Sequence, residues 1–333
     1  MATYKGIQGY TVQKLSDDPT VSEAVGQLWY NSTSGAFKIA TQGAGAWASG
    51  GSLNQARSTG VGYGITSDTA GVVGGYRSSP SAGVVALNEQ YNGTAWTEVA
   101  DLPGANGYMG GAGSQTAALS FGGDARPSPA TVPNPVVLIW NGTSWTETTE
   151  MNSSVAEGYG CGISSSAILS AGGRAAPYPT ATAATESWNG SAWTEGGNML
   201  NTAVKRPLMG TITAALANSV PPSSTVTEQY NGTSWTEVGD SNTNHNSGNG
   251  AGATTDALVY GGTGSTVNTE VYDGSSWTEV ANLASGRHSI QGNVQATNSE
   301  SAVAAGGEGP GGIVGTTEEW TSPIYSIKTV TVS

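Results

Sequence analysis

The chain contains nearly the same phrase five times, and this repetition constrains its fold more than any other feature. In EQYNGTSWTEV, which begins at Glu228, two aromatic residues flank an Asn-Gly pair. The other copies are EQYNGTAWTEV from Glu89, LIWNGTSWTET from Leu138, ESWNGSAWTEG from Glu186 and EVYDGSSWTEV from Glu270. Asn-Gly between two strand-like segments is a strong signal for a β-hairpin, because both central positions tolerate positive φ. Each phrase is therefore expected to form two antiparallel strands joined by a tight turn.

Tryptophans recur at a nearly constant interval through these phrases. They are spaced 49, 49, 48, 42 and 42 residues apart, at Trp47, Trp96, Trp145, Trp193, Trp235 and Trp277. A second aromatic residue ends the strand before the turn, at Tyr91, Trp140, Trp188, Tyr230, Tyr272 and Trp320. Periods of about 40 to 50 residues with several short strands are typical of β-propeller blades. The large rings are expected to fill the widening space between the outer strands of neighbouring blades.

A strand of small residues that ends in a Gly pair precedes each phrase. The pairs end at Gly75, Gly123, Gly173, Gly262 and Gly307, and the fourth repeat has Ser219-Val220 instead. Six such positions predict six blades, each with four strands. The last repeat has no outermost strand after Trp320, whereas the strand around Trp47 has no inner strands before it. This strand is therefore predicted to complete the last blade and to close the propeller.

The composition agrees with an all-β fold and limits the possible partners. Fifty Gly, ten Trp and only two Phe among 333 residues do not resemble the composition of a helical bundle. The formal net charge of -13 argues against nucleic acid or an anionic membrane as a partner. Nowhere do about 18 apolar residues run together, so no membrane insertion is predicted. Cys161 is the only cysteine, and we expect it to be a small buried residue of an inner strand.

Segments at both ends lie outside the repeat and define three predicted parts. Residues 1–46 are predicted to form an anchoring arm, with a β-hairpin in GQLWYNSTSGAFKIA from Gly26 to Ala40. Residues 47–320 are assigned to the propeller, and residues 321–333 to a C-terminal strand. Because an isolated hairpin is only marginally stable, we expect the arm and the tail to pair with each other or with a neighbouring subunit.

All six arginines fall in connections that are predicted to lie on one face of the propeller. Uneven loops on a rigid scaffold commonly carry binding. The candidate binding face therefore comprises Arg57, Tyr76, Arg77, Arg126, Arg174, Tyr178, Arg287 and His288. For Arg57 and Arg287, which occupy equivalent positions in their repeats, a buried guanidinium that braces two blades is the favoured alternative. An anionic glycan or a partner protein is the expected ligand of this face.

No catalytic or cofactor motif is recognisable in the sequence. His245 and His288 are the only histidines, and neither belongs to a cluster with metal-ligand spacing. Five acidic residues recur with the repeat and indicate architecture: Glu98, Glu147, Glu195, Glu237 and Glu279. Asp124 and Glu157 do not follow the repeat, and the sequence shows no partner for either. We expect no enzymatic activity, metal or cofactor; the alternative is a glycan-active enzyme, similar to a depolymerase, whose carboxylates come together only in the fold.

Two resemblances extend these expectations. The Gly pair followed by an aromatic residue and a Trp resembles the kelch repeat over about residues 47 to 320, which implies a six-bladed kelch-like β-propeller. The GQLWYNSTSG hairpin behind a Pro-containing leader, together with the NGTSWTE repeats, resembles structural proteins of tailed bacteriophages, particularly those of marine cyanobacteria. This second resemblance implies a non-enzymatic virion protein that assembles in the host cytoplasm and serves host attachment or protein–protein interaction.

Within the virion, a tail-associated position is the favoured expectation, and decoration of the capsid surface is the alternative. The arm and the tail are expected to dock on other virion proteins. The candidate binding face is expected to contact the host surface.

Overall fold

The structure, a computed structural model, describes residues 12–20, 24, 26–42, 45–124, 133–177, 179–219, 225–292, 298–322 and 325–330. All of the regular elements in these residues are β-strands, as the composition predicts, and none is a helix. The described residues form two compact units. Those before residue 46 and after residue 321 make up the first unit, and those of residues 46–321 make up the second. These boundaries differ by one residue from the predicted ones.

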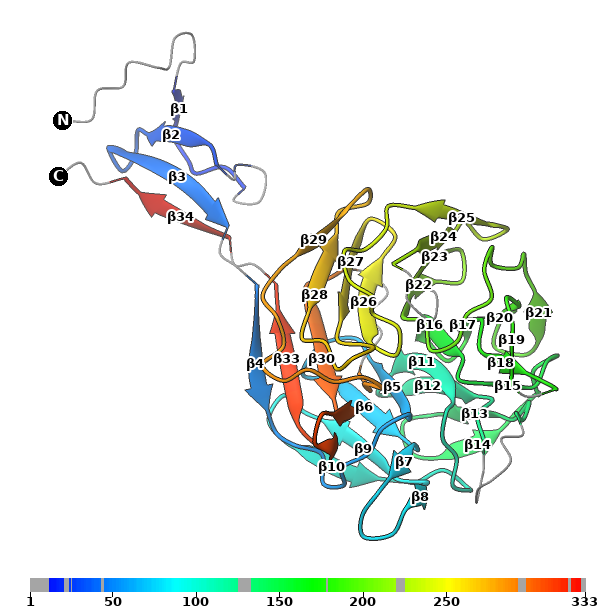
Figure 1. The fold of residues 1–333 in the computed structure, drawn as a ribbon. Coiled ribbons are helices and arrows are strands. Elements are labelled where there is room, and N and C mark those ends of the chain that lie inside the picture. The colour runs from blue at the N-terminus through cyan, green and yellow to red at the C-terminus, as the bar shows by residue number, and fades with distance from the viewer. Residues whose placement is uncertain are drawn as a thin grey trace. The chain divides into compact units, whose positions relative to one another are not determined.

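Five antiparallel sheets of four strands follow one another along the second unit (Figure 1). The first sheet contains β5 (Val61–Gly64), β6 (Ala70–Val73), β9 (Asn88–Tyr91) and β10 (Trp96–Val99). The second contains β11 (Gly110–Ser114), β12 (Ala117–Phe121), β13 (Val137–Trp140) and β14 (Trp145–Glu147). The third contains β16 (Tyr159–Ser164), β17 (Ala167–Ala171), β20 (Thr185–Trp188) and β21 (Trp193–Glu195). The fourth contains β22 (Leu208–Thr211), β23 (Ala214–Asn218), β24 (Thr227–Tyr230) and β25 (Trp235–Val238). The fifth contains β26 (Asn249–Ala253), β27 (Asp256–Tyr260), β28 (Thr269–Tyr272) and β29 (Trp277–Glu279).

A sixth sheet joins the two ends of this unit. It contains β30 (Ser301–Ala305), β33 (Thr317–Thr321) and β4 (Ala46–Gly50). β4 pairs with β33 in antiparallel register, with Trp47 opposite Trp320. The predicted pairing of the Trp47 strand with the last repeat is therefore confirmed. Residues 293–297, which precede β30 in the sequence, lie outside the described residues.

Each sheet packs against the next through its first strand. β5 contacts β11, and the contacts continue from β11 to β16, to β22, to β26 and to β30. The first sheet also packs against the sixth, because Val72 and Trp96 share one buried cluster with Val303 and Ala305. Glycine is needed where these strands crowd together. A Cβ atom on Gly62 would lie 1.5 Å from the carbonyl oxygen of Gly292.

The tryptophans of the outermost strands point between sheets. Trp96, Trp145, Trp193, Trp235 and Trp277 are all buried. The indole Nε1 of Trp96 donates to the hydroxyl of Thr317 in the sixth sheet over 2.9 Å. Trp47 makes the same contact with Thr269 in the fifth sheet over 3.0 Å. The outer rings therefore join neighbouring sheets, as the repeat predicts.

The five predicted hairpins are present, but their turns differ from the expected two-residue type. In the fourth sheet Tyr230 pairs with Trp235, which leaves a loop of Asn231 to Ser234. Only the glycine of this loop has positive φ, 92° at Gly232. Asn231 instead uses its side-chain Oδ1 to accept the backbone N–H groups of Thr233 and Ser234, both over 2.9 Å. The Asn-Gly pair thus acts through an Asx turn rather than through two residues with positive φ.

The first unit is a separate four-stranded sheet. Its strands are β1 (Gln13–Leu15), β2 (Leu28–Asn31), β3 (Ala36–Gln42) and β34 (Tyr325–Thr329). β2 and β3 form the predicted hairpin, and β34 pairs with β3. Arm and tail therefore pair with each other, the first of the two predicted alternatives. Trp29 is buried in this unit and donates its indole N–H to Asp18 over 3.1 Å.

Candidate functional site

Six backbone hydrogen bonds form a closed cycle at the connections that lead into the first strands of the six sheets. The N–H of Tyr108 donates to the carbonyl oxygen of Thr59, that of Glu157 to Tyr108, and that of Lys205 to Glu157. Ser247 then donates to Lys205, Ser289 to Ser247, and Thr59 to Ser289. The N···O distances run from 2.5 to 3.4 Å. One residue of each repeat thus takes part in this six-residue cycle.

The residues of the six-residue cycle share an unusual backbone conformation. Each has a positive φ between 52° and 63°, although none is glycine. This left-handed region costs free energy for residues with a Cβ, by about 1 kcal/mol or more. The surrounding contacts must therefore hold all six residues in place. Strain of this kind is often found at functional sites.

A cavity of about 330 Å³ opens beside the six-residue cycle. We call it the polar cavity. It is lined by Ser58, Thr59, Tyr76, Ser78, Tyr108, Lys205, His288, Ser289, Glu308, Gly312 and Ile313. Hydroxyl groups, two aromatic rings and three ionisable side chains thus meet in one hollow. Such a mixture offers hydrogen bonds in both directions together with flat surfaces for stacking.

Glu157 is the centre of the charge arrangement next to the polar cavity. Its carboxylate lies 2.6 Å from Nε of Arg174 and 3.8 Å from Nζ of Lys205. The ammonium group of Lys205 also lies 5.5 Å from the centre of the Tyr108 ring, a cation–π arrangement. Both cations are partly exposed, whereas Glu157 is buried. Glu157 therefore positions two basic groups at the surface.

The structure brings several predicted site residues together on one face. Tyr76 and His288 line the polar cavity, and Arg174 pairs with Glu157, which lines a neighbouring hollow. Arg77 lies on the short hairpin of β7 (Tyr76–Arg77) and β8 (Gly83–Val84), where its guanidinium donates to Ser81 over 3.3 and 3.4 Å. The candidate residues Arg126 and Tyr178 lie outside the described residues.

Arg57 and Arg287 do not belong to an accessible binding face, so their assignment to it is corrected. Both are buried, with exposed fractions of 0% and 1%. Arg57 forms an ion pair with Glu89, and Arg287 with Glu318 at 2.9 Å. A buried guanidinium that is paired with a buried carboxylate cannot contact a partner without breaking that pair. The alternative interpretation predicted this burial, but the side chains do not join two sheets: Arg57 contacts Glu89 and Val72 of the first sheet, and Arg287 contacts Glu318 and Ala304 of the sixth.

The glutamates in these pairs form a buried set that the sequence analysis did not recognise. Each is the second residue of the strand that carries the first aromatic residue of the phrase. The set comprises Glu89, Glu186, Glu228, Glu270 and Glu318. Each accepts N–H groups from the connection that precedes its sheet, as Glu228 does from Leu200 over 2.9 Å. A sequence signal was present, because each glutamate lies two residues before a buried aromatic residue and so on the same face of its strand.

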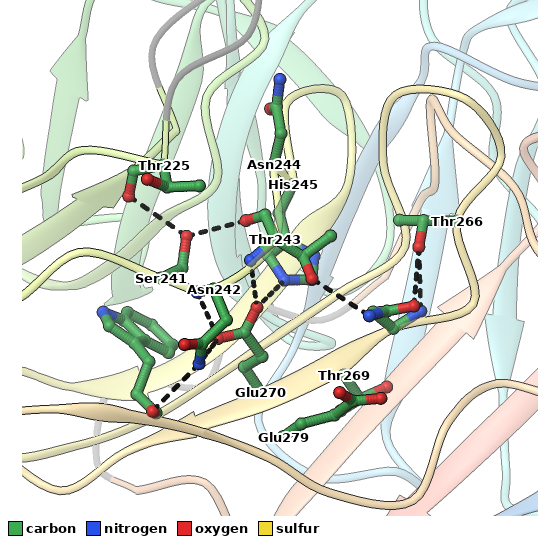
Figure 2. Close-up of polar contacts among 12 residues, drawn as sticks. Thr225, Ser241, Asn242, Thr243, Asn244, His245, Thr266, Thr269, Glu270 and Glu279 are labelled. Carbon is green, nitrogen blue, oxygen red and sulfur yellow. Dashed lines mark hydrogen bonds and ion pairs between the residues drawn. The ribbon is translucent and has the colours of Figure 1, made fainter.

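Figure 2 shows this arrangement at Glu270 in the fifth sheet. Its carboxylate accepts the N–H groups of Asn242 and Thr243 over 2.8 and 2.7 Å, and its Oε1 lies 3.1 Å from Nε2 of His245. Burial opposes ionisation of Glu270, but His245 and Asn242 outweigh it and leave the pKa of this carboxyl lowered. His245 is thus part of the buried framework and not a surface ligand.

No group of three or more His, Cys, Asp or Glu side chains with metal-binding geometry occurs in the part of the chain that the structure describes. Within the same residues, no helix has the length and hydropathy to cross a membrane. Cys161 is buried in β16, as predicted, and burial raises the pKa of its thiol.

Comparison with known proteins adds no family assignment. No protein-family model matches this chain, and no curated protein sequence matches it.

Proposed function

We propose that the six sheets are the blades of a closed six-bladed β-propeller of the kelch type, with β4 as the outermost strand of the last blade. The closed six-residue cycle supports this arrangement, because such a cycle, with one residue per sheet, is expected when the sheets surround a common axis. The contact between Trp96 and Thr317 supports it independently, since it joins the first sheet to the sixth.

On this scaffold we propose a binding function for the face that holds the polar cavity. The observation that carries this proposal is the gathering of non-repeated side chains at the cavity. One hollow is lined by side chains from four separate segments of the chain: Tyr76, Tyr108, Lys205 and His288. These side chains are of three different types. Residues with a purely structural role recur from sheet to sheet, whereas the types of these four side chains do not recur. Departures from a repeat on one face of a rigid scaffold are where binding is expected.

The chemistry of the face favours a glycan that carries negative charge. Tyrosine rings stack on the flat faces of sugars, and the serine and threonine hydroxyls both donate and accept hydrogen bonds. Lys205, Arg174 and Arg77 add positive charge to a chain that is acidic as a whole. A partner protein with an acidic loop is the second ligand of this type.

We further propose that the protein is a non-enzymatic structural component of a bacteriophage virion and is associated with the tail. Two features support this role: the resemblance of the N-terminal hairpin and the NGTSWTE repeats to virion proteins, and a separate unit formed from both ends of the chain. That unit is suited to docking on other virion proteins, while the polar cavity contacts the host surface. Decoration of the capsid surface uses the same anchor and is the alternative position.

The binding function is tested with purified protein and host envelope glycans. Tyr76→Ala and Lys205→Glu are each expected to lower affinity at least about tenfold. Lys328→Glu introduces the same charge change on the exposed tail strand of the other unit and is the matched control. If both cavity variants bind host glycan as the control does, the assignment of the face is wrong. Mass spectrometry of purified tails and capsids then decides the position in the virion.

One observation favours the enzymatic alternative. Glu157 and Glu308 line neighbouring hollows that share Thr59, Tyr108, Lys205 and Ser289. A pair of carboxylates near a sugar site is the arrangement that glycoside hydrolysis uses. Release of reducing ends from host glycan, abolished in Glu308→Gln, would replace the binding function with a glycan-active enzyme.

A further inference from the structure

Three buried glutamates are each matched by an arginine from the connection that precedes their sheet, and the contacts of these arginines follow one plan. In the first sheet, Nη2 of Arg57 donates to the carbonyl oxygen of Val72 over 3.0 Å. Val72 is the residue paired with Glu89 across the strands. Arg57 therefore meets a carboxylate and the backbone carbonyl beside it.

The fourth and sixth sheets repeat this plan. Nη2 of Arg206 donates to Ala217, which is paired with Glu228, over 2.9 Å. Nη2 of Arg287 donates to Ala304, which is paired with Glu318, over 3.2 Å.

A second carbonyl completes these two sites. The oxygen of Val226 lies 3.3 Å from Arg206, and that of Thr316 lies 3.5 Å from Arg287. Val226 and Thr316 each stand two positions before the paired glutamate. One carboxylate and two carbonyl oxygens thus form a recurring guanidinium site.

The third sheet keeps the acceptors, but none of its described residues supplies the cation. Glu186 is buried and accepts the N–H groups of Asn152 and Ser153 over 3.0 and 3.1 Å. Its strand partner is Ser170, and Ala184 stands two positions before it. These three residues line one cavity of about 40 Å³, which we call the Glu186 cavity.

The position that carries arginine before the first and sixth sheets is an apolar residue here. In the fourth repeat the equivalent position is Ala203, and its arginine stands three residues later. Val155 accepts the N–H of Gly123 through its carbonyl, as Arg57 accepts that of Gly307 and Arg287 that of Gly262. Val155 also lines the Glu186 cavity. A valine side chain is too short to reach the carboxylate and carries no charge to neutralise it. Among the described residues, Glu186 therefore has no arginine partner like those of Glu89, Glu228 and Glu318, and burial raises its pKa.

We propose that the Glu186 cavity binds a guanidinium group, supplied by an arginine side chain of a partner protein or by a free guanidinium ion. A planar group with several N–H donors matches a carboxylate and backbone carbonyl oxygens, as it does three times within this chain. The cavity exceeds the roughly 10 to 15 Å³ that one water molecule needs. The cavity is also lined by three half-buried polar residues, Ser153, Ser154 and Thr182. A cationic group from solvent can therefore enter along polar side chains. This proposal does not depend on the function assigned to the polar cavity.

The test is a thermal unfolding titration of the full chain followed by tryptophan fluorescence. Guanidinium chloride at up to about 20 mM is expected to raise the unfolding midpoint by about 1 °C or more in a saturating manner, relative to equal NaCl. N-acetyl-arginine amide is the second probe. A rise with both probes identifies an arginine side chain as a ligand, and a rise with guanidinium alone identifies the free ion. Equal midpoints in guanidinium and NaCl overturn the proposal.

Two variants place the effect at this cavity. Glu186→Gln keeps an acceptor oxygen for the two N–H groups but removes the charge, so the response to guanidinium should disappear. Val155→Arg should provide an internal guanidinium, raise the midpoint above that of Val155→Met and also abolish the response. If Glu186→Gln responds as the native chain does, the ion binds elsewhere and the proposal fails, even if Val155→Arg does not fold.

Discussion

The backbone N–H of Thr59 donates to the carbonyl oxygen of Ser289 over 3.4 Å, and this bond joins the connection before the first sheet to the connection before the sixth. The other five bonds of the six-residue cycle link connections that follow one another along the chain. The bond between Thr59 and Ser289 is therefore the one that turns a row of contacts into a closed cycle. Both residues have positive φ, 60° at Thr59 and 52° at Ser289.

Thr59→Asn should stabilise the protein. A β-branched residue is poorly suited to positive φ, whereas Asn tolerates it. We expect the free energy of unfolding to rise by about 0.5 to 1 kcal/mol, measured by denaturant titration. Thr236→Asn, on the exposed side of β25, is the control and should bring no gain. An equal effect of the two substitutions would show that the backbone of Thr59 is not strained.

The repeat allowed much of this fold to be predicted, because one physical requirement recurs in every unit. Large rings at Trp96 and Tyr91 need a neighbouring sheet to cover them, and their spacing revealed both the sheets and the pairing of Trp47 with Trp320. The burial of Arg57 was also predicted from its equivalence with Arg287. These inferences depended on positions that repeat.

The features of the site could not be predicted in the same way. The six-residue cycle contains five different types of residue and no glycine, so its positive φ angles leave no compositional signal. The ion pair of Glu157 with Arg174 joins two connections whose proximity depends on the packing of the third sheet. The Asx turn at Asn231 needed knowledge of the loop length, which the Asn-Gly pair does not contain.

Trp47→Ala should weaken the closure between the two ends of the second unit. The indole of Trp47 packs against Trp320 and Tyr260, with ring centres 5.5 and 4.9 Å apart, and bonds to Thr269. Its removal should cost about 3 kcal/mol of unfolding free energy. Trp47→Phe keeps a ring and should cost about 1 kcal/mol, mainly the lost hydrogen bond. Denaturant titration of both variants measures these free energies of unfolding. Equal losses of stability in the two variants would mean that packing of the ring contributes little.

Glu186 and Glu270 should make opposite contributions to the pH dependence of stability. Burial raises the pKa of Glu186, so its stabilising contribution is present below the unfolded pKa of about 4.3 and is lost as pH rises through the folded pKa. The pKa of Glu270 is lowered, so its contribution is present above about 4.3 and is lost as pH falls through the folded pKa.

Substitution by glutamine isolates these two contributions. Relative to the native chain, Glu186→Gln should gain stability as pH rises from 4 to 8. Glu270→Gln should be less stable at pH 7, and the difference should shrink toward pH 3. Unfolding free energies measured across this pH range provide the comparison. Parallel curves for the two variants would contradict the assigned directions.

Asp273→Asn should remove an acid-sensitive element from one turn without weakening it near neutral pH. Asp273 takes the place of the asparagine in the fifth hairpin and accepts the N–H groups of Ser276 and Ser275 over 2.8 and 2.9 Å. These bonds, with that of the Ser275 hydroxyl, lower the pKa of Asp273 to about 2. Its contribution to stability is therefore present above the unfolded pKa of about 3.9 and is lost as pH falls toward 2.

The other four turns use the amide oxygen of Asn for the same N–H groups, so Asp273→Asn should match the native unfolding midpoint at pH 7 and exceed it at pH 2.5. Asp273→Ala lacks the acceptor and should lie below both at pH 7; if it equals them, the side chain does not stabilise the turn.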